Sequence, residues 1–343
     1  MKKQIFRIGI KNYPAAHGGV EMCTYNFVRA TKDKYDFTIF TVWDNPSVVN
    51  NDIDGVKVFR LKKRWISRFR QIRSAVVDKR NTVLDFQMAI FIPLAIVFSF
   101  LGYNVVSSIH GISWGNPKIP RYMQFIMFFV DILGANFARR SMYVAKHNYD
   151  EMRHWTLRKL YYNPNGSPIS TDIVCNPSKD LVFIGRISIQ KNLINLIDAV
   201  EIARRHLDLY GPIDEREAAH AAEFRRKLEN THYAHYCGAL KSEDVYNVLG
   251  KYKCFVNPSW SEASPVAVME AGANGLFLYL SDVAGHRNLG FPDVHYFPSR
   301  KIDLPAVDMK RSVSNIQWHR DHLSIEANLA RYETLYNSFE RTK

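Results

Sequence analysis

The order of short apolar runs and longer helical stretches is the feature that most constrains how this chain folds. In the first half, short runs rich in β-branched and aromatic residues alternate with helix-like stretches that begin near residues 18, 65, 89, 121 and 148. The strands expected from these runs are residues 5–10, 37–42, 56–61, 82–86, 105–109 and 142–145. Strands that alternate with helices predict parallel sheets with crossover helices.

A linker interrupts this alternation, which then starts again. Residues 163–180 are crowded with Pro, Asn, Gly and Ser, which is typical of a connection between domains. Beyond it we expect strands at residues 181–184, 207–210, 232–237, 254–257 and 276–280, helices at 192–205, 215–228, 242–249 and 266–274, and a long amphipathic helix at 319–339.

The length of the chain fits two domains, because 343 residues exceed one ordinary core. We expect two Rossmann-like α/β domains that face each other across a cleft. Residues 1–165 form the first, residues 166–318 form the second, and residues 319–343 form a helix that packs back toward the first. In such sheets, ligands bind beyond the carboxyl ends of the strands.

The composition, 47% hydrophobic and 23% charged, is that of a soluble globular protein. The cysteines, Cys23, Cys175, Cys237 and Cys254, lie far apart, which favours reduced thiols in a cytoplasmic protein over disulfides or zinc ligands. The N-terminus does not read as a signal peptide, because charged residues interrupt its apolar stretch. The apolar run 88–101 has 14 residues, fewer than the ~20 that span a bilayer, and predicts a buried helix.

Positive charge is concentrated in the first half. Residues 1–165 contain 25 Lys and Arg against 11 Asp and Glu, whereas the remainder contains 21 against 22. This excess predicts that the first half meets something anionic.

One basic segment, residues 56–80, suggests what that anionic partner is. Its apolar residues, Trp65, Phe69, Ile72 and Val76, fall on one helical face beside four arginines. Such a helix can lie on the inner face of an anionic membrane, or it can pack its apolar stripe on the sheet. The uneven charge favours the membrane.

Two glutamates near the end of the second domain are candidates for chemistry. Glu262 lies in the loop after an expected strand and can accept hydrogen bonds from sugar hydroxyls. Pro265, Val266 and Ala267 open the next helix, whose first amides can hold phosphate oxygens. Glu270, eight positions after Glu262, would suit the hydroxyls of a ribose. On spacing alone, an ordinary loop glutamate and an ordinary helix glutamate are the favoured explanation of the pair.

The residues around the two glutamates favour a functional interpretation. The segment PSWSEASPVAVMEAGANG resembles the signature of glycosyltransferase family 4. Other segments of the second half resemble, in the expected order, the strand–Gly-Arg–loop–Lys–helix unit (LVFIGRISIQKNLINLIDAV), the nucleotide-pocket segments (LDLYGP and YCGAL) and the S-D-x-x-G segment (LSDVAGHRNL). In the first half, GIKNYPAAHGGVE, VVSSIHGISW and NPNG resemble the Gly-Gly loop, the strand ending in His-Gly and the turn at the linker.

The resemblance implies a GT-B fold and a retaining enzyme similar to the glycosyl group 1 transferases of bacterial polysaccharide synthesis. Such an enzyme moves a hexose from a nucleotide diphosphate sugar to a glycan or lipid-linked acceptor. The resemblance places Arg186 and Lys191 on the donor diphosphate, Gly18 and Gly19 near its phosphates, and His110 beside the donor sugar.

The chemistry of the leaving group agrees with these roles. The departing diphosphate gains negative charge, and two cations, Arg186 and Lys191, can neutralise it without a metal or another cofactor. Asp52 and Asp54 form the metal-binding pattern of the other large glycosyltransferase fold, but they precede a Gly and predict a turn. Glu21 either faces the acceptor or begins a helix, and His17 is a further candidate.

Two other classes of function stay open. A sugar-nucleotide epimerase of the same fold would use the same donor site. A non-catalytic basic scaffold that binds nucleic acid or membrane would explain the charge of the first half. It would not explain the ordered donor motifs, so we expect no nucleic acid partner.

Overall fold

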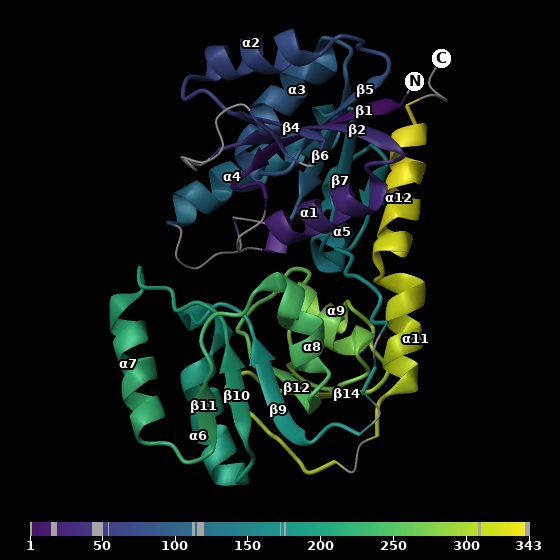
Figure 1. The fold of residues 1–343 in the computed structure, drawn as a ribbon. Helices are drawn as coiled ribbons and strands as arrows, with labels where there is room; N and C mark the ends of the chain where they lie inside the picture. The colour runs from purple at the N-terminus through teal and green to yellow at the C-terminus, as the bar shows by residue number, and fades with distance from the viewer. Residues whose placement is uncertain are drawn as a thin grey trace. The chain divides into compact units, whose positions relative to one another are not determined.

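The computed structural model describes residues 2–14, 19–42, 51–53, 55–111, 114, 120–171, 173–174, 176–307 and 310–339. The chain divides into two compact units (Figure 1). Unit 1 comprises Met1–Asn165 and Asn328–Lys343, and unit 2 comprises Gly166–Ala327. The second boundary therefore lies after Ala327, where the sequence analysis places it after residue 318.

Unit 1 is built on an eight-stranded sheet. Its strands are β1 (Lys3–Ile10), β2 (Tyr35–Thr41), β3 (Asn51–Ile53), β4 (Val56–Arg60), β5 (Thr82–Phe86), β6 (Asn104–Ile109), β7 (Arg140–Tyr143) and β8 (Leu160–Tyr162). Their order is β3-β4-β2-β1-β5-β6-β7-β8, and every pair is parallel except the β3–β4 hairpin. The sequence analysis did not expect β3 or β8, because three residues carry no periodic signal.

The helices of unit 1 follow its strands as the alternation predicts. They are α1 (Gly19–Thr31), α2 (Trp65–Ala75), η1 (Ala89–Phe91), α3 (Ile92–Phe100), α4 (Arg121–Phe137), α5 (Lys146–Met152), η2 (Arg153–Trp155) and most of α12 (Ile325–Asn337). The apolar run 88–101 forms η1 and α3, but only one side of it is buried, including Ile92, Leu94 and Phe98. No helix among the described residues is both long and apolar enough to cross a membrane.

The apolar stripe of α2 faces the core of unit 1. Ile72 is fully buried, and Phe69 packs on Phe98 of α3 with ring centroids 4.9 Å apart. Val76 belongs to the same cluster, and Trp65 is partly exposed. The stripe therefore packs on its own domain, which is the second of the two interpretations above.

Helix α12 completes the core of unit 1. Tyr332, Leu335, Tyr336 and Phe339 are buried beside residues of the sheet and of α1. They enclose a buried ion pair in which Arg7 Nε lies 3.6 Å from Asp85 Oδ2. The Tyr336 hydroxyl donates to the same carboxylate at 3.2 Å, so the last helix satisfies a charge on β5 that lies 251 positions earlier in the chain.

Unit 2 has a six-stranded parallel sheet. The strands are β9 (Lys179–Ile184), β10 (Leu207–Tyr210), β11 (Ala234–Tyr236), β12 (Tyr252–Asn257), β13 (Phe277–Ser281) and β14 (Val294–Phe297). Their order, β11-β10-β9-β12-β13-β14, is that of a doubly wound nucleotide-binding fold. The direction of winding reverses between β9 and β12, and the crevice at such a reversal is where these folds bind ligands.

The helices of unit 2 are η3 (Ile189–Lys191), α6 (Leu193–Ala203), α7 (Ala218–Glu229), η4 (Ser242–Asp244), α8 (Val245–Leu249), α9 (Val266–Ala273), α10 (Ala284–Arg287) and α11 (Val313–His322). Helix α11 stays with this unit because Asn315 donates to Leu276 O and Trp318 to Leu289 O. Two parallel, doubly wound sheets confirm the α/β class expected from the alternation.

Candidate functional site

The candidate donor site of unit 2 is formed by the loops that follow β9 and β12, the two strands at the winding reversal. Gly185 follows β9, and its N–H donates to Tyr210 O at 2.9 Å. Gly211 follows β10 with φ +136°, and a Cβ there would lie 1.9 Å from Gly185 O. The neighbouring loops therefore approach so closely that only glycine fits at position 211.

Asn192 connects the loop after β9 to the loop after β12. It is buried with φ 56°, and its amide donates to Pro258 O at 3.1 Å and to Ser299 O at 2.8 Å. The Trp260 N–H donates to Gln190 O at 2.9 Å, and the Gln190 amide donates to Ser261 O at 2.8 Å. These bonds fix the position of Lys191, which lies between them in the sequence.

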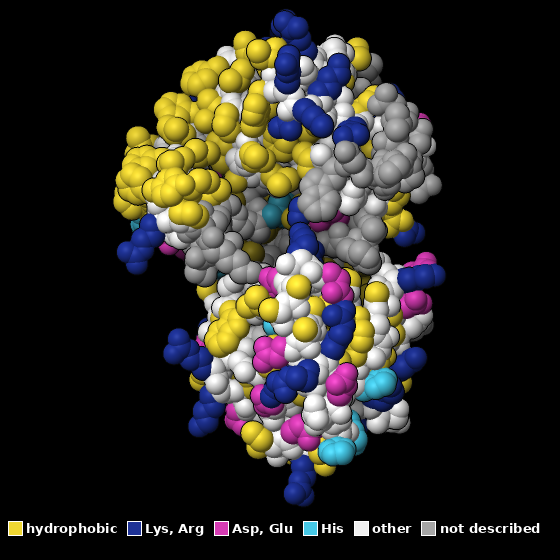
Figure 2. All heavy atoms as spheres, turned by 90° about the vertical axis from the view of Figure 1, so that its left-hand side faces the viewer, with side chains coloured by type: hydrophobic (Ala, Val, Ile, Leu, Met, Phe, Trp, Pro, Cys, Tyr) yellow, Lys and Arg dark blue, Asp and Glu magenta, His cyan; other side chains and the backbone are white. Residues whose placement is uncertain are grey.

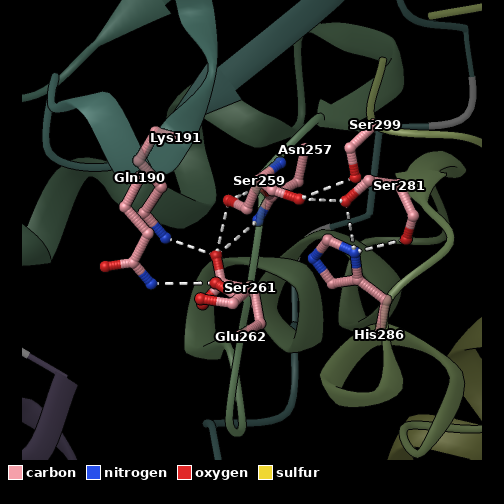
Figure 3. A network of polar contacts seen from close by, with 9 residues as sticks. All are labelled: Gln190, Lys191, Asn257, Ser259, Ser261, Glu262, Ser281, His286 and Ser299. Atoms are coloured by element: carbon pink, nitrogen blue, oxygen red, sulfur yellow. Dashed lines mark hydrogen bonds and ion pairs between the residues drawn. The ribbon is translucent and has the colours of Figure 1, made fainter. Parts of the chain in front are cut away.

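Lys191 and Glu262 meet in this loop pair (Figure 3). Lys191 Nζ lies 2.5 Å from Glu262 Oε1, and the two side chains are 20% and 8% exposed. The structure thus brings together two of the residues that the sequence analysis assigned to the donor.

The Glu262 carboxylate is held by one of its two oxygens. Oε1 also accepts from Ser259 Oγ at 2.7 Å and from Asn257 Nδ2 at 3.4 Å. Burial alone would raise the pKa of Glu262, but Lys191, His286 and Ser259 together lower it. Glu262 is therefore ionised at neutral pH, and within the described part of the chain no hydrogen bond reaches Oε2. That oxygen can accept a ligand hydroxyl.

The sequence analysis missed the residues behind Glu262. His286 of α10 is fully buried, and its Nδ1 lies 2.8 Å from Ser281 O (Figure 3). A Cβ on Gly285 would lie 2.1 Å from Glu262 O, so the backbone of α10 packs directly against the loop that contains Glu262. These residues lie in the segment LSDVAGHRNL, which the sequence analysis linked to the donor site. The motif does not show which of its side chains is buried behind Glu262.

Glu270 stands apart from this pair, although it lies on α9, the helix that follows the loop. Its side chain is half-buried, and burial raises its pKa to about 8. Among the described residues no hydrogen bond or ion pair reaches its carboxylate. Val266 and Ala267 form the first turn of α9 behind Pro265, so their N–H groups have no acceptor within the helix.

Arg186 is also separate from the Lys191–Glu262 pair. It follows Gly185, is 44% exposed, and its Nη1 lies 3.6 Å from Asp214 Oδ2. Arg216 binds the same carboxylate more closely, at 2.7 Å. Arg186 is therefore only loosely held and can turn toward a phosphate.

In unit 1, His110 follows β6 in a buried polar network. Its Nε2 lies 2.7 Å from Gln87 Oε1, which also accepts from Arg7 Nη1 at 3.4 Å. Because that oxygen accepts, Nε2 carries the proton and Nδ1 is an acceptor. Nδ1 is buried and has no partner among the residues described. Burial and the nearby Arg7 lower the pKa of His110 to about 3, so the ring is neutral.

Of the other candidates in unit 1, Gly19 begins α1, whereas Gly18 and His17 lie outside the described residues. Glu21 is 4% exposed and accepts from the Lys11 N–H at 3.3 Å, which favours the helix-start interpretation. Asp52 is exposed in the β3–β4 hairpin, and Asp54 lies outside the described residues. The part of the chain that the structure describes has no group of three His, Cys, Asp or Glu able to hold a metal.

Comparison with known proteins agrees with this fold. Residues 178–294, which include the candidate residues of unit 2, match the model of the family Glycosyl transferases group 1. A comparison with curated protein sequences gives no match.

Several solved structures share the fold over almost the whole chain. Sucrose-phosphate synthase from Thermosynechococcus elongatus superposes with a TM-score of 0.83 at 14% identity, covering 100% of both chains. HepE of Anabaena, in complex with UDP and glucose, gives 0.74 at 14% identity, covering 98% of this chain and 99% of that one. The lipopolysaccharide outer core galactosyltransferase WaaB gives 0.67 at 16% identity, covering 98% and 99%. These similarities confirm two Rossmann-like domains of the GT-B class.

Proposed function

We propose that this protein is a retaining glycosyltransferase of family 4, which moves a hexose from a nucleotide diphosphate sugar to a glycan or lipid-linked acceptor. The observation that carries the proposal is the contact between Lys191 Nζ and Glu262 Oε1 at 2.5 Å, in the loops after β9 and β12, between which the sheet of unit 2 reverses its winding. A cation and an ionised carboxylate are what a phosphate-linked sugar requires of its binding site.

Each unit 2 candidate has a role in holding the donor. Glu262 Oε2 accepts from a sugar hydroxyl, while Lys191 turns one of its remaining N–H groups to the diphosphate. Arg186 leaves Asp214 to bind the same diphosphate with its planar fork. The free amides of Val266 and Ala267 bind phosphate oxygens, and Glu270 binds the ribose.

The transfer step needs no group beyond donor and acceptor. The bond between the sugar carbon and the phosphate oxygen breaks on the face where the bond to the acceptor oxygen forms. The acceptor proton passes to the departing phosphate, and Arg186 and Lys191 stabilise its negative charge. We propose that neither a metal nor another cofactor takes part. To His110 we assign contact with the donor sugar through Nδ1, which is supported by its unpaired, unprotonated state.

The similar structures suggest which donors to try first. HepE was solved with UDP and glucose, and WaaB is a galactosyltransferase of the lipopolysaccharide outer core. UDP-hexoses are therefore the first donors to test, with bacterial polysaccharide intermediates as acceptors. The positive charge of residues 1–165 supports a place at the inner face of the cytoplasmic membrane, where lipid-linked acceptors are found.

The test measures transfer from a panel of radiolabelled donors by Lys191→Ala and Glu262→Ala. We expect each variant to lose about 10²–10³-fold in kcat/KM, because each removes a charge that the donor needs. Glu223→Ala on α7, an exposed glutamate of the same unit, is the matched control and keeps full activity. Wild-type turnover in both site variants would exclude the proposal. Chelation by EDTA leaves activity unchanged if no metal takes part.

Incubating the protein with donor but no acceptor distinguishes a glycosyltransferase from a sugar-nucleotide epimerase. A glycosyltransferase leaves the donor sugar unchanged or hydrolyses it slowly, whereas an epimerase converts it to a second sugar nucleotide. Appearance of a new sugar nucleotide, seen by chromatography, would replace transfer with epimerisation.

A further inference from the structure

Helix α4 turns its bulky apolar residues outward. Six of them are between 45% and 68% exposed: Tyr122, Phe125, Ile126, Phe129, Leu133 and Phe137. The fully buried positions of the helix are Asp131, Gly134 and Ala135, which are small or polar, whereas Phe128, Val130 and Ile132 are only partly buried against the core of unit 1. A Cβ on Gly134 would lie 2.9 Å from Ile92 of α3, and buried Asp131 accepts from Trp114 Nε1 at 2.9 Å. A surface helix normally places its apolar side chains on the core, so the six that α4 also exposes to solvent call for another explanation.

The exposed apolar surface continues onto α3. Ile90, Val97, Phe100 and Leu101 are between 46% and 73% exposed. The rings of Phe100 and Phe137 lie 6.1 Å apart and join the two helices. We call this surface the α3–α4 face, and Figure 2 shows hydrophobic side chains gathered over this side of unit 1. Exposed apolar patches of this extent mark surfaces that meet a partner or a membrane.

The charges around the α3–α4 face are positive. The sequence has no charged residue between Asp85 and Lys118, and α4 carries only Arg121 and the buried Asp131. Helix α2 packs on α3 and carries no acidic residue. The cations exposed on α2 and just before it are Lys62, Lys63, Arg64, Arg70 and Arg73. Figure 2 shows Lys and Arg side chains beside the hydrophobic ones.

We infer that the α3–α4 face inserts into the surface of an anionic lipid bilayer while the cations of α2 bind lipid phosphates. An anionic bilayer has negatively charged headgroups at its surface and an apolar interior beneath them. The exposed apolar side chains of the α3–α4 face can enter the interior, while the neighbouring cations of α2 stay at the level of the headgroups. A second copy of the face would bring like charges together, which opposes self-association. The inference does not rest on the proposed transfer reaction, and it places the membrane contact on α3 and α4 rather than on the buried stripe of α2.

Flotation of the full-length protein with lipid vesicles tests this inference. One set of vesicles is phosphatidylcholine, and the other is phosphatidylcholine and phosphatidylglycerol in equal parts. We expect binding to the anionic vesicles, weakened by salt, and little binding to the neutral ones. The double variant Phe125→Ser, Phe129→Ser should lose at least about tenfold in affinity, because it removes two inserted rings.

The cations give a second, independent variant. Arg64→Gln with Arg70→Gln should lower affinity for the anionic vesicles about 25-fold, at about fivefold for each charge, without affecting binding to neutral vesicles. Ile202→Ser on α6 is the matched control, because Ile202 is 86% exposed in unit 2. The side chains replaced in these variants are exposed, so the temperature of thermal unfolding and the affinity for the donor should remain unchanged.

Three results would overturn the inference. The first is that the wild-type protein does not float with anionic vesicles. The second is that the serine and glutamine variants float as well as the wild type. The third is a dimer in sedimentation velocity that the serine variant dissociates, without vesicle binding, which would make a second copy the occupant of the face. Each leaves the proposed transfer reaction untouched.

Discussion

Lys191 and Glu262 form a mostly buried ion pair, so the donor proposed above would meet two charges that neutralise each other. Glu262 is 8% exposed and receives every one of its described contacts at Oε1. The ion pair keeps the carboxylate ionised and its second oxygen available. Substituting either residue should therefore lower the folding stability, because the other charge is left buried and unpaired. It should also remove one of the contacts proposed for the ligand.

If Glu270 binds the ribose as proposed, donor binding should depend on pH. Burial raises its pKa to about 8, so its carboxyl is protonated at neutral pH. Ribose hydroxyls donate to a carboxylate, so binding lowers this pKa, and affinity should rise with pH up to about 8 and then level off. The slope should be at most about tenfold per pH unit. Calorimetric titration with a UDP-hexose at several pH values measures it.

The variant Glu270→Gln provides the control, because an amide does not titrate. Its affinity should be independent of pH over the same range. The ligand-free wild type should also lose stability relative to this variant as pH rises from 4.5 to about 8, because the folded state keeps a proton that the unfolded chain releases. A slope that persists in the variant would assign the pH dependence to another group.

At the scale of elements, the loops after β9 and β10 depend on one glycine. Gly211→Ala would force a Cβ to within 1.9 Å of Gly185 O at φ +136°. We expect unit 2 to lose about 3 kcal/mol or more of unfolding free energy, since the strained backbone alone costs about 1–3 kcal/mol. Urea unfolding followed by tryptophan fluorescence measures this loss.

A second glycine distinguishes the cost of backbone strain from the cost of a steric clash at the new Cβ. Gly238 also has a positive φ, +84°, but nothing lies within 4 Å of its Cβ position. Gly238→Ala should therefore cost only the backbone strain. Equal losses in the two variants would show that the loops after β9 and β10 can move apart, against the close packing described above.

At the scale of the whole molecule, the end of the chain stabilises its beginning. Ending the chain at Ala327 removes Tyr332, Leu335, Tyr336 and Phe339 from the core of unit 1. Each such side chain contributes about 1.5–3 kcal/mol when buried, so unit 1 should lose about 6 kcal/mol or more. The buried Arg7–Asp85 pair would also lose the hydroxyl of Tyr336.

Calorimetry separates the two units in this experiment. The truncated chain should lose the unfolding transition of unit 1 and keep that of unit 2, together with donor binding, because Lys191 and Glu262 lie in unit 2. A chain that ends at Phe339 is the control and should behave as the full chain does. Two unchanged transitions in the shorter chain would mean that α12 adds little to unit 1.

Sequence alone determined the order of strands and helices, the linker, and the loops that contain the donor candidates. These are local properties, because the spacing of apolar residues and the composition of turns follow from the backbone geometry of each segment. The three-residue strands β3 and β8 carry too few residues for such a pattern, and β14, with four residues, was not predicted either. The resemblance of ordered motifs added Arg186, Lys191, Glu262 and Glu270, which no spacing rule would have selected.

The tertiary structure alone decided which partners these residues meet. Glu262 is paired with Lys191, which lies 71 positions earlier, and rests on α10, where the sequence analysis assigned nothing. The apolar stripe of α2 packs on its own unit, whereas α4 packs some apolar side chains on the core and exposes six others. An amphipathic pattern states that a helix has an apolar side, but the side that is buried depends on which neighbours fill the space against the sheet, and those neighbours come from distant parts of the chain.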